Sequence, residues 1–177
     1  MNTNSGKLRQ KLKFNKFPFG VYLLLVAVIV VFFAATQGTI SPAHLMNIVR
    51  QSAPLGVAAM GQTIVLLVGG IDLSVGATMS MVNLVAASVM GGSDAQILPA
   101  LLICMALCLL VGLLNGYIIA TFKMQPFLVT MAMSMIIEGG YYIYTKGIAK
   151  GSIATGIRFI SEGWIGIVPI AAIIWLV

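Results

Sequence analysis

The feature that most constrains this chain is a run of 19 residues, 18–36, that contains no charged side chain. An α-helix rises about 1.5 Å per residue, so about 20 apolar residues cross the roughly 30 Å hydrocarbon core of a bilayer. Similar runs occupy 51–70, 75–92, 97–122 and 125–145, and another opens at Trp164. None shows the strict two-residue alternation of a membrane β-barrel. The sequence therefore predicts an all-α, polytopic transmembrane helical bundle with five spans and an incomplete sixth.

The distribution of charge supports this prediction. Only 8% of the residues are charged, against about 25% in an ordinary soluble domain. Five of the ten basic residues precede the first run: Lys7, Arg9, Lys11, Lys13 and Lys16. Such a cluster holds an N-terminus in the cytoplasm, and the run that follows is too long for a signal peptide and has no good cleavage site. We expect a basic cytoplasmic segment, 1–17, then a transmembrane domain, 18–177, and no nucleic-acid partner despite the net charge of +6.

A cytoplasmic N-terminus assigns a side of the membrane to every later turn. The turn at 69–74 and Lys123 then face the cytoplasm, whereas the turn at 91–96 and the polar stretch 146–163 face outward. A broken or re-entrant second segment would shift the later assignments. The sequence stops inside an apolar run, which predicts a truncated domain.

The chain offers little material for catalysis. It has four acidic residues and one histidine, and it lacks a phosphate-binding P-loop and a zinc-protease motif. Cys104 and Cys108 lie four residues apart, which suits helix packing, whereas a metal pair would need further ligands. The sequence predicts no catalytic residue, no metal site and no cofactor.

Several polar side chains interrupt the apolar runs. Gln62, Asn83 and Asn115 can join helices through hydrogen bonds worth about 0.6 kcal/mol each, or they can line a hydrophilic path. Glu138 sits about two-thirds along its run. It lies either near the outer interface, close to a group of tyrosines, or buried within the span. A buried carboxylate would indicate a functional position, because a charge inside a membrane is costly.

Asp72 is the only charged residue between positions 51 and 90. Forty residues of helix measure about 60 Å, twice the hydrocarbon core, so the chain must turn near the middle. Gly69 and Gly70 are suited to end one helix with positive φ, and Asp72 is then placed to cap the next helix at the membrane face. The alternative is that Asp72 gates a pathway, since half-helix starts also form substrate sites in transporters.

Three stretches carry a family pattern: GQTIVLLVGGIDLSVGATMSMVNLVAA (61–87), VGLLNGYIIATFKMQPFLVTMAMSMI (111–136) and YTKG (144–147). The motif residues are Gly69, Gly70, Ile71, Asp72, Leu73, Ser74, Val75, Gly76, Asn115, Gly116, Lys123, Pro126, Phe127, Leu128 and Thr130. With these residues the chain resembles the permease subunit of bacterial ATP-binding-cassette (ABC) importers for ribose, galactose and related sugars. It departs from that family at Glu138, where an arginine is usual.

The resemblance implies an inner-membrane subunit, embedded in lipid, that moves a sugar or sugar-like solute into the cytoplasm. It implies three partners: an ABC ATPase subunit that hydrolyses ATP, a periplasmic solute-binding protein, and a second permease subunit, identical or different. The chain itself would not be an enzyme, and docking of the ATPase becomes a further role for Asp72. The residues alone leave two alternatives, a secondary transporter or channel subunit and a truncated remnant that does not transport.

Overall fold

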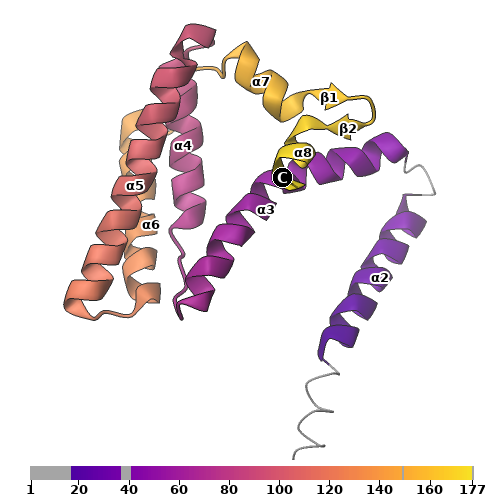
Figure 1. Cartoon of the computed structure of the whole chain (residues 1–177), viewed down its shortest axis with the longest axis horizontal. Coiled ribbons are helices and arrows are strands. Elements are labelled where there is room, and N and C mark those ends of the chain that lie inside the picture. Colours follow the sequence, from indigo (N-terminus) through magenta and orange to yellow (C-terminus); the bar gives the residue numbers. More distant parts are fainter. Residues whose placement is uncertain (1–16, 37–40, 149, 177) are drawn as a thin grey trace, which may run out of the picture. The chain divides into compact units, whose positions relative to one another are not determined.

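The computed structural model describes residues 17–36, 41–148 and 150–176 (Figure 1). The chain divides into two units, Met1–Leu45 and Met46–Val177. The first unit contains helix α2 (Phe17–Ala35), in which every side chain between Phe19 and Phe33 except Gly20 and Ala27 is large, apolar and exposed. A helix that is apolar all round is either buried or a membrane span. The predicted basic segment lies outside the described residues apart from Phe17.

The second unit is mainly helical. Its elements are α3 (Pro42–Leu67, which begins in the first unit), α4 (Val75–Met90), the 3-10 helix η1 (Asp94–Gln96), α5 (Ile97–Phe122), α6 (Pro126–Thr145), α7 (Thr155–Glu162), β1 (Trp164–Ile165), β2 (Val168–Pro169) and α8 (Ile170–Leu176). The runs predicted from the sequence therefore correspond to α4, α5 and α6 to within two residues.

Helix α3 begins nine residues before the predicted start of its apolar run at 51. The reason is that a charged residue ends an apolar run without ending a helix, and Arg50 lies inside α3. Pro54 also lies inside this helix, where it cannot donate a backbone hydrogen bond. The helix bends partway along its length (Figure 1), and proline is the usual cause of such a kink.

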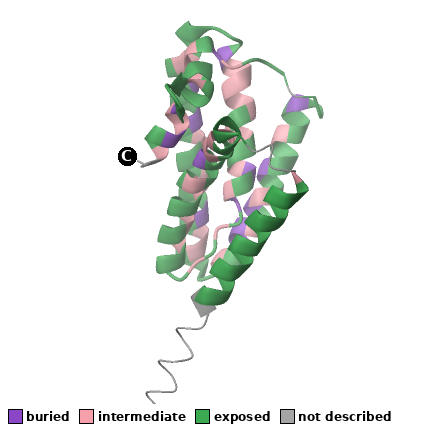
Figure 2. Ribbon diagram, turned by 90° about the vertical axis from the view of Figure 1, so that its right-hand side faces the viewer, coloured by how far each residue is buried: buried purple, intermediate pink, exposed green. Residues whose placement is uncertain are grey.

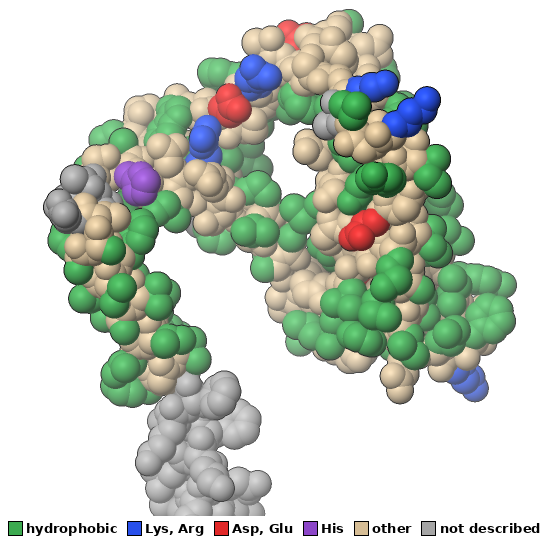
Figure 3. Space-filling view, turned by 180° about the vertical axis from the view of Figure 1, so that it is seen from behind, with side chains coloured by type: hydrophobic (Ala, Val, Ile, Leu, Met, Phe, Trp, Pro, Cys, Tyr) green, Lys and Arg blue, Asp and Glu red, His purple; other side chains and the backbone are tan. Residues whose placement is uncertain are grey.

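The three helices α4, α5 and α6 pack against one another (Figure 1). Ala77, Met133 and Ile137 form one buried cluster in this bundle. A second cluster joins Met90, Ala100 and Ala154. The outward faces of the helices are exposed (Figure 2), and charged side chains on the face in Figure 3 are few. Apolar faces of this extent are those of helices that contact lipid or other membrane helices.

Two helices of the described residues are long and apolar enough to cross a membrane, Asp94–Phe122 and Pro126–Thr145. Two shorter apolar helices, Phe19–Ala35 and Val75–Met90, accompany them. The structure thus has the helical, apolar character that was predicted, while the count of five spans and part of a sixth remains a prediction.

The prediction that a span opens at Trp164 is wrong. Trp164 pairs with Pro169, and Ile165 with Val168, in a two-stranded antiparallel hairpin. Gly166 has φ +64° in the two-residue connection, and tight hairpin turns need this positive φ. The apolar helix that follows, α8, begins only at Ile170.

The connections group at two ends of the bundle, in the pairs expected from the sequence. At one end the segment that joins α3 to α4 meets the start of α6, where Thr130 contacts Leu73. At the other end the Gly92 N–H donates to the Ser152 carbonyl, and the Asp94 carboxylate accepts the Gly156 N–H at 2.9 Å. A carboxylate at the first turn of α7 satisfies a free N–H and complements the helix dipole.

Candidate functional site: a broken helix inside the bundle

Helix α3 ends in a Schellman motif. Gly69 has φ +84°, and its N–H donates to Leu66 O at 2.9 Å. The Gly70 N–H reaches back to Val65 O at 3.0 Å, which completes the motif's two hydrogen bonds. The predicted positive φ is confirmed at Gly69, whereas Gly70 lacks it.

After this motif the chain enters the bundle as a non-helical segment, residues 70–74. A Cβ on Gly70 would lie 3.5 Å from Pro126, the first residue of α6. Leu73 then meets Thr130, one turn further along α6. Ser74 meets Asn115, which lies seven residues before the end of α5, or about 10 Å at 1.5 Å per residue. Helix α4 therefore begins inside the bundle and not at its end.

The backbone groups of this segment are satisfied by side chains of other helices. The Thr130 hydroxyl accepts the Leu73 N–H at 3.0 Å and lies 3.2 Å from Ile71 O. In the amide orientation that pairs both of its polar atoms, Gln62 donates to Asp72 O at 3.3 Å and accepts the Asp72 N–H at 3.2 Å. In a bilayer such partners are essential, because each unsatisfied backbone group costs several kcal/mol.

Asp72, Ser74 and Asn115 form a chain of hydrogen bonds. Asp72 Oδ1 accepts the Ser74 N–H at 2.7 Å and the Ser74 hydroxyl at 2.6 Å. Asn115 Nδ2 donates to Ser74 Oγ at 3.1 Å. The Asn115 Oδ1 atom is buried without a partner among the described residues.

The structure corrects the prediction that Asp72 is the capping residue of α4. The residue at the N-cap position is Ser74. Asp72 bonds the backbone two residues ahead, which is an Asx turn. The carboxylate is half-buried inside the bundle.

The structure brings together three of the five polar candidates, Gln62, Asp72 and Asn115. Asn83 and Glu138 are exposed on α4 and α6 and lie outside this group. The roles of Ser74 and Thr130 were missed by sequence reasoning, although both belong to the family pattern. Their contacts join residues 41 and 57 positions apart, and no local spacing signals such a contact.

A cavity of about 170 Å³ lies between α4 and α5 beside the Asp72 carboxylate. Its lining includes Asp72, Ser74, Thr78, Met79, Cys108 and Gly112. Asp72 Oδ2 has no hydrogen-bond donor among the described residues. Those residues also contain no cluster of metal-binding side chains. The cavity therefore offers oxygen atoms that can accept hydrogen bonds.

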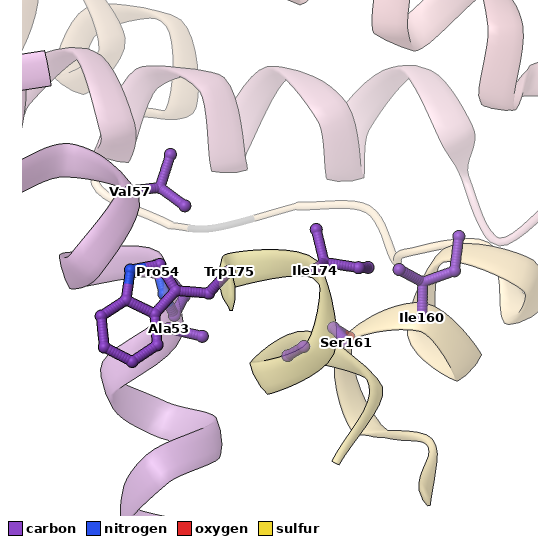
Figure 4. Close-up of a pocket in the computed structure, with 8 residues that line it drawn as sticks. Ala53, Pro54, Val57, Ile160, Ser161, Ile174 and Trp175 are labelled. Carbon is purple, nitrogen blue, oxygen red and sulfur yellow. The ribbon is translucent and has the colours of Figure 1, made fainter. Parts of the chain in front are cut away.

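A second cavity, of about 220 Å³, lies between α3, α7 and α8 (Figure 4). Figure 4 shows Pro54 and Val57 of α3 near Trp175 of α8. Any side chain at Gly56 would collide with the Trp175 indole ring. The lining is almost wholly apolar, so this cavity is a packing feature and not a chemical site.

The apolar helices and the satisfied break within them are features of helical membrane proteins. A family model described as branched-chain amino acid transport system / permease component matches residues 44–176. The chain belongs to this family of permease components.

Curated relatives agree with this assignment. The ribose import permease protein of Escherichia coli (strain K12) is 33% identical over 150 residues, which cover 81% of this chain and 45% of that protein. The ribose import permease protein of Bacillus subtilis (strain 168) is 33% identical over 160 residues, or 88% of this chain and 48% of that protein. The xylose transport system permease protein of Haemophilus influenzae is 31% identical over 179 residues, or 93% of this chain and 47% of that protein. The chain spans about half the length of these relatives, and no solved structure matches it.

Proposed function

We propose that this chain acts in the permease subunit of an ABC importer that moves a sugar or sugar-like solute into the cytoplasm. The observation that carries the proposal is that relatives named for ribose and xylose transport match 81% to 93% of the chain. The family description names branched-chain amino acids instead. The relatives favour a sugar, since each of them matches a larger share of the chain than the family model, which covers residues 44–176.

The proposal includes an arrangement in the inner membrane. Five spans and part of a sixth cross the bilayer, with the N-terminus in the cytoplasm. A separate ATPase subunit hydrolyses ATP, a periplasmic binding protein delivers the solute, and a second permease subunit, identical or different, completes the pathway. The break between α3 and α4 supports a transport role, because discontinuous helices form solute sites in many transporters.

Uptake by the complete importer tests the proposal. Cells that contain this permease with its ATPase and binding protein should accumulate labelled D-ribose or D-xylose. Because ATP drives such an importer, uptake should survive a proton uncoupler and should disappear when the ATPase subunit is inactivated. Uptake that an uncoupler abolishes would instead identify a secondary transporter.

Reporter fusions test the proposed topology. The basic cluster before an uncharged span should hold the N-terminus inside. A reporter that works only in the periplasm should therefore be active when it is fused after Gly38. A reporter that works only in the cytoplasm should be active when it is fused after Lys123. A cytoplasmic result at Gly38 would reverse every assignment, and a fusion after Gly92, expected outside, provides the internal control.

A further inference from the structure

The Asp72 carboxylate has one oxygen committed to the protein and one available. Both donors from Ser74, its N–H and its hydroxyl, bond to Oδ1. Ser74 is itself held by the Asn115 amide and is only 1% exposed, so the carboxylate is fixed in orientation. The second oxygen, Oδ2, receives no hydrogen bond from any described residue.

This free oxygen belongs to a side chain that lines the 170 Å³ cavity between α4 and α5. The cavity extends to Cys108, an exposed residue of α5. A carboxylate that opened to lipid would be strongly disfavoured, because charged side chains are costly in hydrocarbon. The cavity therefore faces a solvated path or another protein surface more favourably than it faces lipid.

We propose that this cavity is a contact site for the transported solute, with Asp72 Oδ2 accepting hydrogen bonds from hydroxyl groups of a sugar. This inference rests on the proposed function and assigns a position to the solute. The Thr78 hydroxyl of the lining donates to Ser74 O at 2.8 Å, which leaves its oxygen as a further acceptor. Val75, Met79 and Val111 supply apolar walls against which the C–H groups of a sugar can pack. The volume is well below the roughly 300–1,000 Å³ of pockets for drug-sized ligands, which fits a small solute.

The composition of the lining favours a hydroxylated solute over its rivals. Among the described residues, no lysine, arginine or histidine lines the cavity, so an anion would find no counter-charge from these side chains. A zwitterionic amino acid could pair its ammonium group with Asp72, but its carboxylate would lie close to a like charge. A sodium ion would find one carboxylate, where hard cations prefer several oxygen ligands.

Cys108 allows a direct test, since it lines the same cavity. In the purified full chain, Cys104→Ala removes the buried thiol and leaves Cys108 as the only target for N-ethylmaleimide. D-ribose or D-xylose should slow this modification. In Asp72→Asn, whose side-chain oxygen can still accept from Ser74, the sugar concentration for half-protection should rise at least about tenfold, because hydrogen bonds to a charged group are stronger than those to a neutral one.

Two matched variants keep the test decisive. Glu138→Gln removes an exposed carboxylate of α6, outside the cavity, and should leave protection unchanged. Gly112→Cys, combined with Cys104→Ala and Cys108→Ala, places the reporter at another lining position where a Cβ meets no atom within 4 Å. This variant replaces Cys108 as the target where Cys108 itself reacts too slowly to follow.

The proposal is overturned if a sugar that the complete importer takes up fails to protect either thiol. It is also overturned if the sugar protects Asp72→Asn as well as it protects the chain with Asp72. Protection by L-leucine in place of the sugar would overturn it too, as would protection by sodium chloride that choline chloride does not give. Uptake in cells separates the two levels of the hypothesis. Sugar uptake without Asp72-dependent protection removes only the site, whereas absence of any sugar uptake removes the proposed function.

Discussion

Thr130→Val is expected to lower the free energy of unfolding by about 1–3 kcal/mol, the usual cost of leaving a buried polar group unpaired. The two side chains have nearly the same shape, so the change removes the hydroxyl and little else. The Leu73 N–H would lose its acceptor at 3.0 Å. The single hydroxyl proton, which lies within reach of Pro126 O at 2.9 Å and Ile71 O at 3.2 Å, would also be lost. Thr130 is only 3% exposed, so water cannot replace the hydroxyl without entering the bundle.

Thr145→Val provides the matched control. Thr145 is also a buried threonine of α6, 8% exposed, but among the described residues its hydroxyl donates only to Tyr142 O of the same helix. The helix retains its backbone hydrogen bonds without that hydroxyl, so the loss should be much smaller. Unfolding of the purified variants in mixed micelles by increasing denaturing detergent measures both. Equal losses in the two variants would show that Thr130 does not support the segment at 70–74.

The helices could be predicted from the sequence because a bilayer imposes a length and a polarity on each span. The runs at 97–122 and 125–145 correspond closely to α5 and α6. Helix α5 ends before Lys123, which has φ +51°, and helix α6 begins at Pro126. Where polarity and helix length diverge, the prediction fails, as at the start of α3. It also fails at Trp164, which begins a hairpin and not the predicted span.

The candidate site was predictable in its members but not in its arrangement. Asp72 and Asn115 attract notice because polar groups are rare in such runs. Their connection through Ser74 depends on how α4 packs against α5, and the chain enters the bundle before α4 begins. A turn at the membrane face was the simplest way to divide forty apolar residues. The structure instead uses side chains of Gln62 and Thr130 to satisfy the backbone, which makes a break inside the bundle possible.

Gly151→Ala is expected to detach the segment 150–157 from the bundle, at a cost of about 2–4 kcal/mol from steric overlap and strained φ together. Gly151 has φ +96°, and a Cβ there would collide with the Ala87 backbone of α4. That backbone cannot easily yield, because Ala87 O accepts hydrogen bonds from both Gly91 N and Ser152 N at 3.1 Å. Displacement of the segment would also break the hydrogen bond between Gly92 N and Ser152 O.

Limited trypsin digestion of the purified chain follows this change, since Lys150 and Arg158 flank the affected contacts. Cleavage after either residue should be faster in Gly151→Ala, because protease cleaves the opened state. Gly166→Ala separates backbone strain from steric collision. Gly166 has φ +64° but open space around its Cβ position, so the alanine variant would carry backbone strain of about 1–2 kcal/mol without a collision. Faster cleavage in Gly151→Ala alone assigns the effect to the contact with Ala87. Equal cleavage in both variants would show that the segment is held by its own backbone conformation and not by its packing against α4.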